Sequence, residues 1–273
     1  MNRTYRYWAS TLGLVLTGVI FVVPFAFILL TSLKTRQEAN LLEFSWPTEI
    51  AFVDNLVDVI QARDLMLVIA FINSTVLTVA SVAGIVVLSA MVAFVLQRRK
   101  TRWNPFINFV VLSGLIIPPA VVPTIWVLQG ISLFDTMLGL ILVEVAFGLS
   151  FSILLFRAFI STIPREIDEA AIIDGAGPLR VFFRIILPLL KPVVVTVIVV
   201  QAVQVFNDFV NPLYFLPGNP TVQLTLYNFQ SQFQTSYNLL FMDILLITIP
   251  PLVMFIFFNR QIVAGMISGA VKG

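Results

Sequence analysis

Six long apolar segments constrain this chain more than any other feature of its sequence. A helix needs roughly 20 consecutive apolar residues to cross the hydrocarbon core of a bilayer. The chain is 59% hydrophobic and only 11% charged, a composition that would leave large apolar patches exposed on a soluble domain. We therefore predict an all-α membrane protein, with residues 1–273 forming a single transmembrane domain. Its six spans are expected at about 9–33, 68–96, 106–128, 137–159, 192–214 and 239–259.

The distribution of basic residues orients these spans. Thirteen of the sixteen Lys and Arg residues lie at the two termini or in and beside the loops that follow the second and fourth spans. Basic residues mark the cytoplasmic side of a membrane protein, so both termini are predicted to be cytoplasmic. The other three, Lys34, Arg36 and Arg63, lie on the opposite side. The first span is too long for the apolar region of a signal peptide, and we expect it to be retained.

Several kinds of chemistry are disfavoured by what the sequence lacks. It contains no Cys and no His, so disulfides, thiol nucleophiles and imidazole bases are excluded and no metal site is expected. No Gly-x-x-x-x-Gly-Lys-Ser/Thr loop is present to hold the phosphates of ATP. The chain is therefore expected to be neither an enzyme nor a cofactor-binding protein, and nucleic acid is not an expected partner.

Prolines are predicted to interrupt two of the spans. Pro118, Pro119 and Pro123 fall within the third span, and Pro250–Pro251 within the sixth. Each proline lacks an N–H and leaves a carbonyl without its helical partner. Such sites are either packing kinks or bends around a water-lined pathway.

The loop of residues 161–191 carries clear helix signals. Pro164 and the acidic residues after it suit a helix N-terminus, and Gly175 is a stop signal, which predicts a helix of about three turns. At 100° per residue, one side of this helix would collect Ile163, Ile167, Ala170, Ala171 and Asp174. A second short helix is predicted over 178–187. The segment is either an amphipathic connector on the membrane surface or a docking surface for another protein.

Three separated motifs resemble one family. The spacing of Glu169-Ala170-Ala171, Gly175, Ile185 and Leu187-Pro188 resembles the signature loop of bacterial ABC-importer permeases. Asn207-Asp208-Phe209 and the C-terminal stretch 261–273 resemble the carbohydrate-uptake branch of that family. The similarity extends along nearly the whole chain, which resembles the shorter permease subunit of maltose-type sugar importers.

This resemblance implies a set of partners in a bacterial inner membrane. A second permease subunit would form a heterodimer with this chain, a dimeric ABC ATPase would bind ATP and Mg, and a soluble extracytoplasmic binding protein would deliver substrate near Pro217, Gly218 and Asn219. Membrane lipid would surround the spans. The ATPase would contact the helix between spans four and five, called here the coupling helix, at Glu166, Glu169, Ala170, Ala171, Asp174 and Gly175. It would also contact the C-terminal residues Gly269, Ala270, Val271, Lys272 and Gly273.

Polar residues within the spans suggest where substrate passes. Such residues are costly in a bilayer and usually functional, although they also hold helices together. The candidates are Asn73, Glu144, Gln204, Asn207 and Asp208, all expected in the outer half of the bundle. We expect a sugar or oligosaccharide to move by alternating access. The alternatives are glycerol phosphate or another polar solute carried by the same machine, and a stand-alone ion-coupled transporter.

Overall fold

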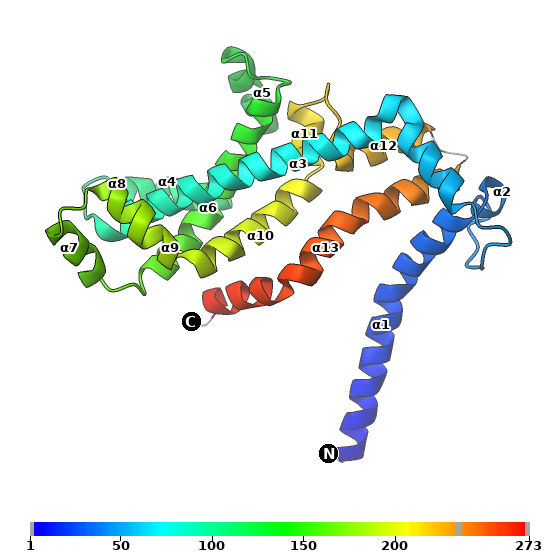
Figure 1. The fold of residues 1–273 in the computed structure, drawn as a ribbon, viewed down its shortest axis with the longest axis horizontal. Coiled ribbons are helices and arrows are strands. Elements are labelled where there is room, and N and C mark those ends of the chain that lie inside the picture. Colours follow the sequence, from blue (N-terminus) through cyan, green and yellow to red (C-terminus); the bar gives the residue numbers. More distant parts are fainter. Residues whose placement is uncertain (1–2, 233–235, 271–273) are drawn as a thin grey trace. The chain divides into compact units, whose positions relative to one another are not determined.

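The computed structural model describes the backbone of residues 3–232 and 236–270, and every regular element in these two ranges is a helix (Figure 1). The predicted all-helical class is therefore confirmed. The chain forms two compact units, residues 1–69 with 224–250 and residues 70–223 with 251–273. Within the described residues, four helical segments are long and apolar enough to span a membrane: Leu16–Leu33, Phe52–Arg98, Met137–Ile160 and Tyr237–Phe258.

A buried network of polar groups organises the first unit. Lys34 is almost fully buried, and its Nζ donates to the Glu43 carbonyl at 2.7 Å and to the Ser45 hydroxyl at 2.9 Å. The Asn55 amide donates to the carbonyls of Ser32 and Lys34, which pins the start of α3 to the end of α1. The first unit contains α1 (Arg3–Leu33), α2 (Arg36–Ala39), the first part of α3 (Phe52–Arg98), most of α12 (Val222–Gln232) and the first part of α13 (Tyr237–Ala270).

The predicted second span begins where α3 changes direction. Residues Ala62–Leu65 leave helical geometry, and Arg63, Asp64 and Leu65 have positive φ angles of 48°, 54° and 62°. Residues other than glycine rarely adopt this backbone conformation. These residues therefore form a break between two helical stretches of α3. The predicted boundary at residue 68 lies just beyond it.

Two of the six predicted spans are not continuous helices. Residues 106–128 form α4 (Asn104–Ile116) and α5 (Val121–Gly130), which are separated at Pro118–Pro119 because proline disfavours helical geometry in the residue before it. Residues 192–214 form α10 (Lys191–Asn207) and α11 (Val210–Phe215), which are separated at Asp208–Phe209. In contrast, α13 continues through Pro250–Pro251.

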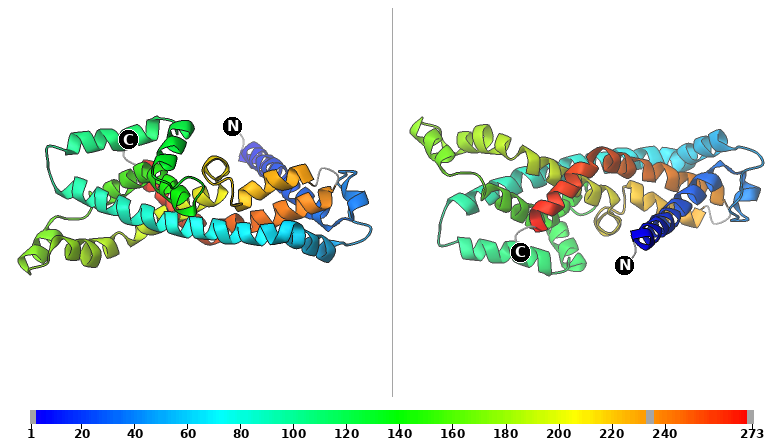
Figure 2. Two further views of the ribbon diagram at one scale, coloured as in Figure 1. Left: turned by 90° about the horizontal axis from the view of Figure 1, so that it is seen from above. Right: turned by 90° about the horizontal axis from the view of Figure 1, so that it is seen from below.

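The second unit is built around α6 (Met137–Ile160), against which α4, α10 and α11 pack (Figures 1 and 2). One apolar cluster includes the fully buried Phe156, Ile160 and Ile186, and a second cluster is centred on Leu140 and Leu216. After α6 come α7 (Glu166–Ile173), α8 (Pro178–Val181), a π-helical turn η1 (Phe182–Ile186) and α9 (Leu187–Leu189). The 178–189 segment bends by 78° against α10.

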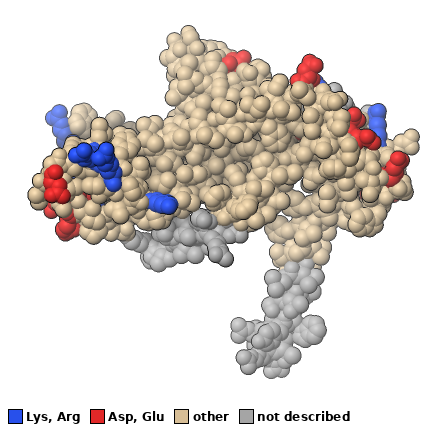
Figure 3. Space-filling view, viewed as in Figure 1, with Lys and Arg blue, Asp and Glu red and all other residues tan. Residues whose placement is uncertain are grey.

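Charged side chains are unevenly distributed over the second unit. On the face shown in Figure 3, Lys, Arg, Asp and Glu gather around α7 and α8, whereas the surface along the middle of α3 has none. Such a separation between a charged end and an uncharged body is expected of a unit whose body lies in lipid.

Candidate functional site

The predicted helix between the fourth and fifth spans is present as α7, although it is shorter than expected. It has eight residues, not three turns, and its first turn carries Glu166, Asp168 and Glu169, which suit the positive end of the helix dipole. Its end is a Schellman motif: the Gly175 N–H donates to the Ile172 carbonyl, and the Ala176 N–H donates to the Ala171 carbonyl. Gly175 has φ +80°, a conformation that explains the need for glycine here.

The exposed face of α7 differs from the predicted one. Glu166, Glu169, Ala170 and Ile173 are exposed and lie on one side of the helix, and Ile173 is 85% exposed. Ala171 is only 6% exposed and packs into the apolar core, so Ala170 and Ala171 do not share a face as predicted. The reason is that neighbouring helices enclose the Asp168 and Ala171 side of α7, and periodicity alone does not identify the covered side.

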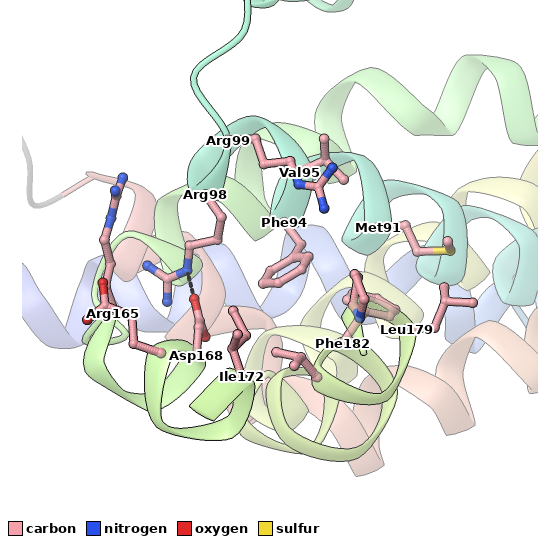
Figure 4. A pocket seen from close by; sticks show the side chains of 13 residues that line it. Met91, Phe94, Val95, Arg98, Arg99, Arg165, Asp168, Ile172, Leu179 and Phe182 are labelled. Carbon is pink, nitrogen blue, oxygen red and sulfur yellow. Dashed lines mark ion pairs between the residues drawn. The ribbon is translucent and has the colours of Figure 1, made fainter. Parts of the chain in front are cut away.

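Polar contacts tie α7 to the end of α3. Asp168 forms an ion pair with Arg98, whose Nη2 also donates to the Ile163 carbonyl at 3.0 Å. Arg165 donates from its Nη2 to the Gln97 carbonyl at 3.2 Å. Figure 4 shows Arg98 and Asp168 facing each other between the two helices. Burial raises the pKa of Asp168, and the attraction of Arg98 opposes this shift without cancelling it. Displacement of α7 would therefore be passed to α3 through these contacts.

Three of the five candidate pathway residues line one cavity. Glu144, Gln204 and Asp208 surround an open space of about 350 Å³, together with Gln201, Asn211 and Phe147 of the same unit. Its size is within the range usual for small-molecule sites.

Hydrogen bonds order the wall of this cavity. Glu144 is 6% exposed, and its Oε1 accepts from the Asn211 amide at 3.2 Å. The Gln201 amide donates to the Ser152 hydroxyl at 3.2 Å. Gly148 allows this close packing, because a Cβ there would lie 2.5 Å from Ile85 Cδ1. The wall therefore presents carboxyl and amide groups on a well-packed support.

Asp208 also has a structural role that the sequence did not reveal. Its Oδ1 accepts from the backbone N–H groups of Val210 at 2.8 Å and Asn211 at 3.2 Å, which caps α11. The break between α10 and α11 is thus stabilised by the same side chain that lines the cavity.

The other two candidates lie away from the cavity. Asn73 donates to the Pro220 carbonyl at 2.9 Å, and Asn207 accepts from the Gln223 amide at 3.1 Å. Both therefore hold the segment after α11. Gly218 in this segment donates to Asp135 at 2.9 Å. This is the segment in which the family resemblance suggests a binding-protein contact.

Sequence reasoning missed Gln201, Asn211 and Phe147. Gln201 lies three residues before Gln204, one helical turn away, and that spacing was the available signal. Of the predicted C-terminal contact, Gly269 and Ala270 belong to the end of α13, and Val271, Lys272 and Gly273 lie outside the described residues.

These features define a class: a helical, multi-pass membrane protein with a polar cavity among its spans and an exposed helix tied to their charged end. The chain belongs to the family described as "binding-protein-dependent transport system inner membrane component", whose model matches residues 85–268. The resemblance to ABC-importer permeases is therefore confirmed, as is the placement in the inner membrane.

Curated relatives match over nearly the full length. The chain is 32% identical over 270 residues to the probable starch degradation products transport system permease protein AmyC of Thermoanaerobacterium thermosulfurigenes, covering 98% of this chain and 97% of that protein. It is 31% identical to the melibiose/raffinose/stachyose import permease protein MelC of Bacillus subtilis, with 99% of both covered.

A solved structure shares the fold. It is a chain of a bacterial ABC transporter involved in the import of the acidic polysaccharide alginate, with a TM-score of 0.79 and 19% identity over 95% of this chain and 98% of that chain. The similarity extends over almost all of both chains, so the two chains share the same overall fold.

Proposed function

We propose that this chain is the permease subunit of an ATP-driven ABC importer and forms half of the pathway for a sugar or oligosaccharide. The observation that carries the coupling part of this proposal is α7, an exposed helix joined to a membrane-spanning helix by the Arg98–Asp168 ion pair. An ATPase bound to α7 could move α3 directly, which a surface connector without such contacts could not do.

We assign the ATPase contact to the exposed face of α7. Glu166 and Glu169 offer carboxylates to basic groups, whereas Ala170 and Ile173 offer a low apolar surface between them. Asp174 and Gly175 complete the face at the end of the helix. Ala171 supports this face from inside the core. The C-terminal residues 269–273 are a second proposed contact.

An arrangement of six spans with both termini in the cytoplasm best explains how the basic residues are distributed along the chain. In this arrangement α4 with α5 forms the third span, α10 with α11 forms the fifth, and residues 1–273 act as one transmembrane domain. A second permease subunit, a dimeric ATPase that binds ATP and Mg, and an extracytoplasmic binding protein complete the machine. Alternating access then follows from closure of the ATPase pair, transmitted through α7.

The cavity favours a hydroxylated, uncharged substrate. Carboxyl and amide groups of Glu144, Gln201 and Gln204 can accept or donate hydrogen bonds to hydroxyls, and Phe147 supplies an apolar wall. Among the described residues that line the cavity, none is Lys or Arg, which disfavours a phosphorylated substrate such as glycerol phosphate. The names of two curated relatives refer to the transport of sugars, which supports the same conclusion.

The test is reconstitution of the purified complex in vesicles. The chain is co-purified with its partner permease and ATPase, and ATP hydrolysis is measured with the binding protein and a panel of neutral sugars, uronic acids and glycerol phosphate. We expect stimulation by a neutral sugar and loss of ATPase association when Glu166 and Glu169 are replaced by Lys. Solute movement by this chain alone, without ATPase, would overturn the proposal in favour of a stand-alone carrier.

A further inference from the structure

A second cavity lies between α3, α7 and α8, away from the proposed substrate cavity. It is an open groove of about 380 Å³, called here the α3–α7–α8 groove. Met91, Phe94, Leu179 and Phe182 form much of its apolar lining. Its polar lining consists of Arg98, Arg99, Arg165, Asp168 and Glu169.

The two kinds of lining are separated along the groove. Figure 4 shows Met91 and Leu179 at one end, and Arg98 and Arg165 at the other. Met91, Phe94 and Arg98 follow one another at helical spacing along α3, so the apolar-to-basic gradient runs along the last two turns of that helix. A ligand that fits this lining is an amphiphile with an anionic head.

Two arginines of the groove, Arg165 and Arg99, favour the binding of an anion. Asp168 is paired with Arg98, so these two side chains largely offset each other. Arg165 uses its Nη2 for the Gln97 carbonyl, and its guanidinium has further N–H donors. Arg99 is exposed at the rim, and Glu169, also exposed, is the remaining acid of the lining. Outside the Arg98–Asp168 pair, the lining therefore holds two arginines and one carboxylate.

The location of the groove identifies the source of the amphiphile. α3 is a membrane-spanning helix, and under the orientation in the proposed function, on which this inference rests, its last turn lies at the cytoplasmic surface of the bilayer. Leu179 of the groove lining is 65% exposed, and Phe183 outside the lining is 45% exposed, as expected for apolar side chains at an interface with lipid. Basic pockets at this depth bind anionic lipid headgroups.

We propose that the α3–α7–α8 groove binds one anionic phospholipid. An acyl chain lies along Met91, Phe94 and Leu179, and the phosphate accepts hydrogen bonds from Arg99 and Arg165. Because the lipid contacts both α3 and α7, it reinforces the connection made by Arg98 and Asp168. Transport by the complex therefore depends on anionic lipid at a specific site, in addition to the general attraction of basic loops to the membrane.

The test uses the whole complex, assembled in nanodiscs of phosphatidylcholine with or without phosphatidylglycerol. Native mass spectrometry counts the phosphatidylglycerol molecules retained, and ATP hydrolysis stimulated by binding protein is measured on the same samples. The test variant is Arg99→Gln with Arg165→Gln. The matched control is Arg180→Gln with Arg184→Gln, which removes the same charge from exposed positions of the same cytoplasmic segment outside the groove lining.

We expect the test variant to retain one fewer phosphatidylglycerol, with affinity weakened about thirtyfold, since each basic residue near an anionic surface contributes roughly 1 kcal/mol. Stimulated ATP hydrolysis should rise with phosphatidylglycerol in the wild type and the control, and not in the test variant. Equal lipid loss in the test and control variants would overturn the proposal. Lipid retention would then depend on the total basic charge of the cytoplasmic segment and not on the groove.

A second variant tests the apolar end of the groove without changing its arginines. Met91→Trp fills the apolar end and leaves both arginines in place, so it should also lose the lipid. Retention of the lipid by this variant would show that the groove does not hold the acyl chain and would overturn the proposal. Displacement of the lipid by millimolar inorganic phosphate would likewise overturn it in favour of a soluble anion. Lipid counts do not depend on ATP hydrolysis, so failed coupling and failed lipid binding are separate results.

Discussion

Gly175 has a backbone role that can be separated from its proposed role in the docking surface. Its φ of +80° ends α7, and a Cβ built there meets no atom of the described residues within 4 Å. The need for glycine within the chain is therefore conformational. A steric need for glycine would come from the ATPase that is proposed to cover α7.

Substitutions at Gly175 separate these two needs. Asn and Asp have nearly the same shape and both tolerate positive φ better than other residues, at a cost of about 1 kcal/mol. We expect Gly175→Asn to retain most sugar uptake and Gly175→Asp to lose it, because only Asp adds a charge beside the ATPase. The measurement is ATP-driven uptake in vesicles with equal amounts of assembled complex. Equal uptake by both variants would remove Gly175 from the proposed contact surface.

Glu144 is the residue through which the proposed substrate cavity can be tested. Glu144→Gln keeps the shape of the side chain and removes its ability to carry charge. We expect the maximal uptake rate to fall about fivefold, as for the loss of one hydrogen bond worth roughly 1 kcal/mol. Uptake is measured at saturating binding protein. The control is Glu49→Gln, the same change at an exposed position outside the cavity lining. An unchanged rate for Glu144→Gln would exclude this residue from the pathway.

At the scale of elements, the connection between α3 and α7 should depend on pH once Arg98 is removed. Asp168 is buried and already has a raised pKa, so Arg98→Met leaves an unpaired carboxylate at neutral pH, at a cost of about 3 kcal/mol. A raised pKa in the folded state means that stability is present at low pH and is lost as pH rises through that pKa. We therefore expect Arg98→Met to unfold more easily at pH 7 than at acidic pH.

Thermal unfolding of the purified chain, followed across pH, provides the measurement for the Arg98→Met variant. The control is the double variant Arg98→Met with Asp168→Asn, which has no carboxylate at this position and should lack the added pH dependence. The same dependence in both variants would show that Asp168 is not its source. Uptake should be reduced in Arg98→Met even where the protein is folded, because α7 is then less firmly joined to α3.

At the scale of the whole molecule, the orientation of the spans can be tested directly because the chain contains no Cys. Single cysteines are introduced at Lys100, between α3 and α4, and at Asn219, after α11; both positions are exposed. We expect a membrane-impermeant maleimide to label Asn219→Cys in cells whose outer layers have been removed and whose inner membrane is intact. Lys100→Cys should react only after permeabilisation. The reverse pattern would contradict cytoplasmic termini.

Local signals in the sequence were sufficient for several features. Apolar length determined the helical membrane class, the prolines at 118 and 119 determined the break between α4 and α5, and Gly175 determined the end of α7, because each effect acts through neighbouring residues. Tertiary structure alone decided that Ala171 is buried and Ala170 exposed. It also decided that Arg98 meets Asp168 and that Glu144 shares a cavity with Gln201. Helical periodicity places residues on a common face, but which face is covered depends on packing between helices that are distant along the chain.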